Sequence, residues 1–73
     1  MTNQPKLERL NEVIARTGLR RSAIYDGVNR GTFPAPVKLG ARASAFVSSE
    51  IDEWIAQLIA ERDARAPGRR RAA

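Results

Sequence analysis

The sequence predicts a mainly α-helical domain with one small β-hairpin. Three observations support this: a glycine turn between two short helical segments, two short apolar segments around another glycine, and a longer helix with strong apolar periodicity near the end. The chain has 73 residues, and a chain of this size buries only about 60% of the surface that its unfolded form exposes. We therefore expect a single domain with a small core.

The first predicted elements lead into a turn at Gly18. Apolar and polar residues alternate over residues 6–10, as in a short strand or an extended lead-in. A first helix follows over residues 11–16, with Asn11 as its N-cap, because an asparagine side chain can accept hydrogen bonds from the free N–H groups of the first turn. Gly18 then ends the helix, since glycine readily takes the left-handed conformation.

The second predicted helix runs from residue 20 or 21 to residue 29 and buries Ile24 and Val28, which lie one turn apart. Gly27 lies inside it and costs about 1 kcal/mol relative to alanine, so we expect the second half to be short or frayed. Gly31 is expected to end this helix. Two short helices joined by a glycine turn predict a helix-turn-helix, in which the N-terminal end of the second helix projects toward a groove of DNA.

A hairpin is predicted after the second helix. Two prolines within residues 32–36 prevent a helix there, and Phe33 is a predicted core residue. Residues 37–39 and 45–47 are short apolar segments on either side of a glycine-containing turn at residues 40–44. This pattern is typical of a small hairpin.

A basic hairpin in this position is interpreted as a wing beside the helix-turn-helix. Lys38 on its strand and Arg42 in its loop would then touch a phosphate or enter the minor groove. A solvent-exposed loop tip is the alternative explanation of Arg42.

The last predicted helix, within residues 48–60, has one apolar face. Ser48 or Ser49 caps its start, and the carboxylates in its first turn suit the positive end of the helix dipole, which explains them without a catalytic role. Its apolar residues recur at helical spacing: Ile51, Trp54, Ile55, Leu58 and Ile59. Trp54 could stack on a base, but on an apolar stripe in so small a protein we interpret it as the largest side chain of the core.

Residues 7–60 thus make up one predicted winged helix-turn-helix domain, and residues 61–73 make up the end of the last helix and a basic disordered tail. Pro67-Gly68 stops the helix. The arginines that follow either add sequence-independent attraction to phosphates or belong to a ragged terminus.

Positive charge is concentrated in the middle of the chain. Residues 16–44 contain six basic residues and one acidic residue, a net charge of +5, whereas residues 45–60 carry −3 and residues 61–73 carry +3. A solvated surface explains such a basic segment in many proteins. Its coincidence with the helix-turn-helix favours double-stranded DNA as the partner, because phosphate contacts need cations clustered on the docking face.

Several function classes are disfavoured by residues that the chain lacks. There is no cysteine or histidine, so disulfides, thiolate zinc sites, catalytic thiols and the usual neutral-pH general base are missing. We expect no enzyme activity, no metal and no cofactor. No apolar run approaches the roughly 18 residues that span a bilayer, and the N-terminus is unlike a signal peptide. We therefore expect a cytoplasmic, nucleoid-associated protein that does not bind membranes.

The order of motifs over about residues 7–60 resembles the AlpA family of prophage-type regulators. The most specific segment is Phe33-Pro34-Ala35-Pro36-Val37-Lys38-Leu39-Gly40, followed by a tryptophan in the last helix. Arg9-Leu10, Thr17-Gly18-Leu19 and Arg21-Ser22-Ala23-Ile24-Tyr25 also match. The resemblance implies a winged helix-turn-helix related to the MerR-type and excisionase domains, acting as a transcriptional regulator of mobile-element genes.

The resemblance also implies how the domain contacts DNA. The second helix, as recognition helix, would enter the major groove, and the wing would hold the neighbouring groove or backbone. Arg21 would lie near the bases and Arg20 on an adjacent phosphate. The predicted DNA-contacting residues are Arg20, Arg21, Ser22, Tyr25, Arg30, Lys38, Arg42 and Ser44.

Three positions depart from the family pattern. Arg20 stands where a serine commonly caps the recognition helix, and Phe46 replaces a frequent tryptophan in the second wing strand. Asp26 places an acid on the helix that faces DNA. Its carboxylate either accepts a hydrogen bond from a cytosine amino group or pairs with Arg30.

Two other functions are open on this sequence. A recombination directionality factor would use the same DNA contacts but bend an attachment site and touch an integrase. A protein-interaction adaptor would dock a partner through its acidic last helix and would show no salt-dependent binding to DNA. If the protein binds DNA, one domain of this size covers a short site, so we expect several copies on repeated sites.

Overall fold

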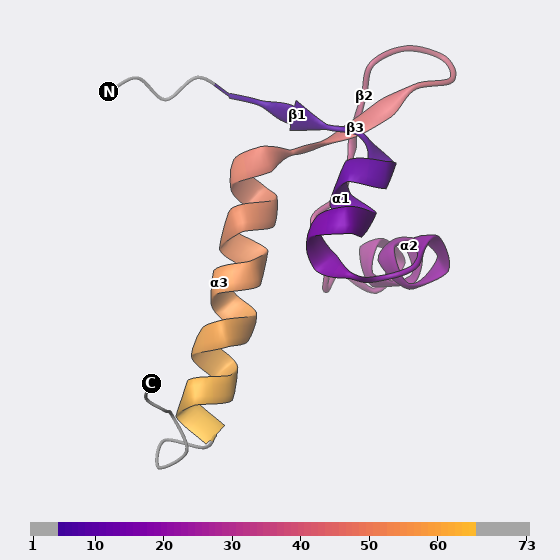
Figure 1. Ribbon diagram of the computed structural model, residues 1–73. Helices are drawn as coiled ribbons and strands as arrows, with labels where there is room; N and C mark the ends of the chain where they lie inside the picture. Colours follow the sequence, from indigo (N-terminus) through magenta and orange to yellow (C-terminus); the bar gives the residue numbers. More distant parts are fainter. Residues whose placement is uncertain (1–4, 66–73) are drawn as a thin grey trace.

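Three helices and a three-stranded antiparallel sheet make up residues 5–65, the part of the chain that the computed structural model describes (Figure 1). In chain order the elements are β1 (Leu7–Glu8), α1 (Leu10–Thr17), α2 (Arg21–Arg30), β2 (Val37–Lys38), β3 (Ser44–Val47) and α3 (Ser48–Arg65). The predicted fold class, a mainly helical winged helix-turn-helix, is confirmed. No helix within residues 5–65 is long and apolar enough to cross a membrane. The predicted arginine tail lies outside the described residues.

The turn between α1 and α2 forms where the sequence predicts it. Gly18 has a φ of 75°, in the left-handed region, and its N–H donates to the carbonyl of Ile14 at 2.8 Å. The Thr17 hydroxyl accepts a hydrogen bond from the N–H of Leu19 at 3.1 Å. Only three residues separate the two helices, and this short connection keeps α1 and α2 adjacent as a helix-turn-helix.

The predicted N-cap of α1 is wrong by two residues. Arg9, not Asn11, is the N-cap, and its carbonyl accepts hydrogen bonds from the N–H groups of Glu12 and Val13 at 3.0 and 3.1 Å. The Glu12 carboxylate in turn accepts from the Arg9 N–H at 2.7 Å. This hydrogen bond to the third helical residue stabilises a helix start two residues before the predicted one. The Asn11 side chain is exposed.

Helix α2 continues through Gly27 to Arg30, so the expectation of a short or frayed second half is wrong. A β-carbon built at Gly27 would lie 2.8 Å from the β-carbon of Phe33. Glycine is therefore present because the loop after α2 packs directly against the helix. Gly31 ends α2 as expected, with a φ of 80°.

The sheet has β3 in the middle. Residues Val37 and Lys38 of β2 pair with Ala45 and Ser44, which confirms the predicted hairpin, and β1 pairs with the other edge of β3, which confirms the short N-terminal strand. We use "wing" for this hairpin and its loop, residues 37–47. Because alternate residues of a strand point to opposite faces, Ser44 and Phe46 share one face of β3.

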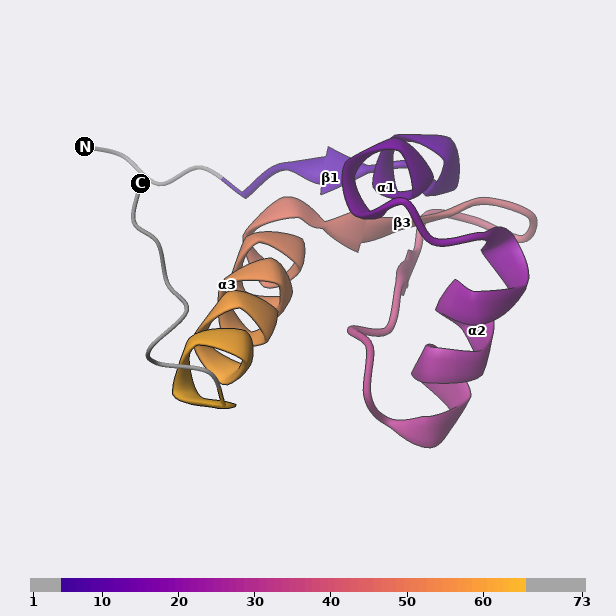
Figure 2. The same ribbon diagram turned by 60° about the horizontal axis from the view of Figure 1, so that its bottom comes forward.

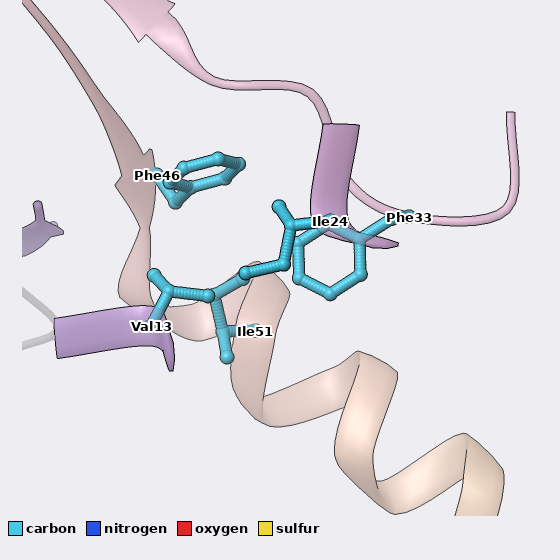
Figure 3. Close-up of a cluster of buried hydrophobic side chains, with 5 residues drawn as sticks. All are labelled: Val13, Ile24, Phe33, Phe46 and Ile51. Carbon is cyan, nitrogen blue, oxygen red and sulfur yellow. The ribbon is translucent and has the colours of Figure 1, made fainter. Parts of the chain in front are cut away.

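The core lies on that face of the sheet, between the sheet and the helices. Figure 3 shows its five buried side chains, which converge from α1, α2, the loop after α2, β3 and α3. They are Val13, Ile24, Phe33, Phe46 and Ile51. The prediction of Phe33 as a core residue is confirmed.

Trp54 corrects the sequence interpretation, because it is half-buried and Phe46 is the largest fully buried side chain. The indole packs edge-on against Phe33, with ring centroids 4.7 Å apart. Its Nε1–H donates to the carbonyl of Thr32 at 2.9 Å. Trp54 therefore seals the rim of the core and fastens the loop after α2 to α3.

Helix α3 packs on the core only at its N-terminal end and then extends away from the rest of the fold (Figures 1 and 2). Leu58 and Ile59 are each 46% exposed, so the apolar stripe is longer than the contact it makes. Ser48 is the first residue of the helix, and its hydroxyl donates to a Glu8 carboxylate oxygen at 2.8 Å. Since Ser48 and Ser49 are both residues of the helix itself, the predicted cap at one of these two serines is wrong.

A charged cluster that the sequence analysis did not predict joins β1, α1 and α3. Arg16 contacts the buried carboxylate of Glu8 at 2.7 Å and also bonds to Asp52. Hydrogen bonding to Asp52, together with the bond to Glu8, raises the pKa of the Arg16 guanidinium above its ordinary value. The cluster holds the start of α3 against α1.

Candidate nucleic-acid interface

The exposed end of α2 carries four of the predicted DNA-contacting residues. Arg20 is the N-cap, with extended backbone and no side-chain capping bond, and Arg21 and Ser22 begin the helix as exposed residues. Tyr25 follows one turn later and is half-buried, with the Arg21 guanidinium 5.8 Å from its ring centroid. This spacing is a cation–π contact, which holds the arginine beside the ring.

The wing places its polar residues toward the helices. Lys38 and Ser44 are directly opposite each other in the β2–β3 pair, so their side chains leave the sheet on the same face. That face is the one from which Phe46 enters the core. In both ribbon views, α2 and the wing loop lie toward one end of the sheet, whereas α3 continues from the opposite end of β3 (Figures 1 and 2).

A hollow of about 410 Å³ joins the wing to the helix-turn-helix. Three predicted residues, Tyr25 from α2 and Arg42 and Ser44 from the wing, line it. The other lining residues are Arg9, Leu10 and Asn11, at the start of α1. The fold therefore brings the two predicted DNA-contacting elements together around one polar depression.

Arg30 lies apart from this group. It is the last residue of α2, about 13 Å along the helix axis from Arg21 at a rise of about 1.5 Å per residue. Its Nε contacts the carboxylate of Asp26 at 2.8 Å in an i, i+4 pair. Of the two roles considered for Asp26, the structure shows the pairing with Arg30.

Ion pairing separates the basic residues of the segment 16–44 into two groups. Arg16 and Arg30 are engaged with carboxylates. The remaining four make no ion pair within residues 5–65, and they are Arg20, Arg21, Lys38 and Arg42. All four belong to the N-terminal end of α2 or to the wing.

Arg9 and Asn11 are polar residues of the hollow that the site prediction does not include. Sequence analysis placed Arg9 in a lead-in segment and gave Asn11 a capping role. Both lie more than 30 positions from Arg42 in the chain, so only the tertiary fold shows that they share a hollow with it. A basic residue immediately before a helix is too common a pattern to reveal such a site.

A second hollow, of about 500 Å³, has the opposite charge character. It lies between residues 31–35 and α3, and its charged lining residues are Glu50 and Glu53. Within residues 5–65 no group of three or more potential metal ligands occurs. Of the two hollows, only the one beside the wing has the chemistry to hold an anion.

Comparison with known proteins matches the chain to one family. The family described as Prophage CP4-57 regulatory protein (AlpA) matches residues 6–59. The chain is 41% identical over 59 residues to the uncharacterized protein ORF88 of Enterobacteria phage P4, covering 81% of this chain and 67% of that protein. It is 38% identical over 58 residues to the DNA-binding transcriptional activator AlpA of Escherichia coli strain K12, covering 71% of this chain and 83% of that protein. The matched region includes α1, α2, the wing and the part of α3 that packs on the core.

Proposed function

Because the chain belongs to the AlpA family, we propose that it is a sequence-specific DNA-binding transcriptional regulator. Helix α2 enters the major groove, and the wing lies on the adjacent groove or backbone. One relative is described as a DNA-binding transcriptional activator, which supports this assignment. The matched segment of 54 residues, from 6 to 59, contains both proposed DNA-contacting elements.

The observation that carries the proposal is the shared position of the unpaired cations. Arg20 and Arg21 at the start of α2 and Lys38 and Arg42 of the wing make no ion pair within residues 5–65, and Tyr25 and Arg42 line the same hollow. A protein cation displaces counterions from DNA only where it is free to contact a phosphate. This surface meets that condition.

The proposed roles follow from position along α2 and the wing. Arg21, Ser22 and Tyr25 lie nearest the base edges, where an arginine can bind guanine bidentately. The other cations contact phosphates and fix the register of the protein on the duplex. They are Arg20, Lys38 and Arg42, together with the hydroxyl of Ser44. Arg30 offsets the charge of Asp26, so that α2 does not present an uncompensated carboxylate to DNA.

The proposal is tested by footprinting the protein on the DNA upstream of its own gene and then titrating the protected site. We expect binding at least about a thousandfold tighter than to a scrambled duplex, and a linear loss of log affinity with log salt. We propose that two or more copies occupy repeated sites, because one domain of this size covers a short sequence. Absence of salt-dependent DNA binding would refute the proposal and favour a protein-interaction adaptor.

The same protected site separates a promoter regulator from a recombination directionality factor. A circular-permutation assay measures whether the protein bends the duplex. A small bend at a site that overlaps a promoter supports regulation. A large bend at an attachment site next to an integrase gene would instead favour the directionality function.

A further inference from the structure

We infer that the hollow between α1, α2 and the wing binds one phosphate of the DNA backbone, with Arg9 and Arg42 as its two cations. This inference rests on the proposed DNA-binding function and adds α1 as a third contacting element. The hollow measures about 410 Å³ and is lined by Arg9, Leu10, Asn11, Tyr25, Arg42 and Ser44. Three separate parts of the fold thus contribute to a single depression.

The lining chemistry suits an anion. Two arginines line the hollow, together with Tyr25, Ser44 and Asn11, whose side chains carry hydroxyl and amide donors, and none of the lining residues is acidic. Arginine binds phosphate through paired N–H donors, and such charge-assisted bonds are among the strongest that proteins make. The oxygens of one phosphodiester can accept hydrogen bonds from the two arginines, the Asn11 amide and the Ser44 hydroxyl.

The donors are also available. Within residues 5–65 neither Arg9 nor Arg42 makes an ion pair, and the side chains of Asn11, Tyr25 and Ser44 make no hydrogen bond to another described residue. By contrast, three other arginines in the same range are held by carboxylates. A phosphate would therefore gain these contacts without breaking an existing pair.

The start of α1 adds backbone donors to the side chains. Leu10 and Asn11 are the first two residues of an eight-residue helix, and N–H groups at such positions have no partner within the helix. They lie at the positive end of the helix dipole. Two carboxylates flank these residues in sequence. Glu8 bonds to Arg16 and Ser48, Glu12 accepts from the Arg9 N–H, and neither lines the hollow.

The position of the hollow explains why the phosphate belongs to DNA. If the start of α2 lies in the major groove and the wing lies on the neighbouring groove, the strand between the two grooves passes between these elements. The hollow is located there, with Tyr25 on the α2 side and Arg42 and Ser44 on the wing side. Arg9 then contacts the backbone from α1 and carries no base specificity.

The test uses the full chain and its footprinted duplex, in a series where one phosphodiester at a time is replaced by an uncharged methylphosphonate. Wild-type protein should lose affinity about three- to tenfold at one replaced position near the wing. The Arg9→Gln variant should bind matched and scrambled duplexes about three- to tenfold more weakly, with a salt slope reduced by about 0.9. At that replaced position the Arg9→Gln variant should lose little further affinity, because its contact with the phosphate is already missing.

The matched control is Arg62→Gln, which removes the same charge from an exposed arginine near the end of α3 that pairs with Asp63. It should change affinity less than about twofold and leave the salt slope unaltered. Circular dichroism verifies that both variants fold. Arg42→Gln removes the second proposed cation of the hollow and tests the same phosphate contact from the wing side. If Arg9→Gln binds like wild type, or remains fully sensitive at every replaced position, the phosphate site is refuted while DNA binding stands. If wild-type protein shows no salt-dependent DNA binding, the proposed function and this site fail together.

Discussion

Gly27→Ala should destabilise the protein, although alanine in place of glycine usually stabilises a helix. The helix preference alone favours alanine by about 1 kcal/mol. However, the new β-carbon would lie 2.8 Å from the β-carbon of Phe33, well inside the carbon–carbon contact distance of about 3.5–4.0 Å. The clashing atom is attached directly to the backbone, so no side-chain rotation relieves it.

The loop that carries Phe33 is also held from several sides. Its ring contacts Phe46 and Trp54, with centroid distances of 5.9 and 4.7 Å, and its N–H donates to the carbonyl of Gly27 at 3.1 Å. Forcing an extra carbon into such a contact costs about 1–3 kcal/mol. After the gain of about 1 kcal/mol in helix preference, we expect a net loss of up to about 2 kcal/mol.

Thermal and urea unfolding followed by circular dichroism measure this effect. Each kcal/mol of lost stability lowers the Tm of a domain of this size by roughly 4–8 °C. Asn29→Ala is the control, because it also introduces alanine into α2, at an exposed position. It should stabilise the protein by a few tenths of a kcal/mol. An unchanged or raised Tm for Gly27→Ala would show that the close packing of Phe33 on α2 does not determine the residue at position 27.

Further substitutions test the interface, the charged cluster and the indole hydrogen bond of Trp54. Arg21→Ala should weaken binding to the matched site by about 1–3 kcal/mol, with less effect on a scrambled site. Lys38→Ala should weaken binding to the matched and scrambled sites alike and flatten the salt slope. Equal titrations for wild type and both variants would contradict these roles. Arg16→Met should lower the free energy of unfolding in urea by about 1–3 kcal/mol, because it leaves the Glu8 carboxylate buried without its cation. Adding Glu8→Gln should recover part of that loss. If the effects of the two substitutions are simply additive, the pairing does not contribute to stability. Trp54→Phe should cost about 1 kcal/mol through its lost indole hydrogen bond, and an unchanged urea midpoint would show that this bond contributes no stability.

The parts of the fold that the sequence predicts well depend on local signals. Gly18 and Gly31 end their helices in the left-handed region, and only neighbouring residues are needed to see why. The hairpin follows from two apolar segments around a glycine turn. In each case the interaction that decides the structure spans a few residues, so the sequence pattern and the backbone agree.

The errors arise where distant residues decide the outcome. Gly27 was expected to weaken α2 because its contact with Phe33 depends on how the following loop folds back. The Ser48 hydroxyl bonds to Glu8, 40 positions away in the chain, instead of capping its own helix. The apolar stripe of α3 predicts a buried face, but nothing in the pattern shows that the core ends before Leu58.

The same distinction governs the candidate site, because ion pairing, not charge alone, decides which cations are available to DNA. Arg16 and Arg30 belong to the basic segment of the sequence, yet both are held by carboxylates, whose negative charge offsets that of the guanidinium groups. Arg9 lies outside the segment, where the first fifteen residues sum to zero charge, but it shares the hollow with Arg42. Since counterion release counts contacts rather than net charge, a residue from a neutral stretch of sequence contributes as much to DNA affinity as one from the basic centre.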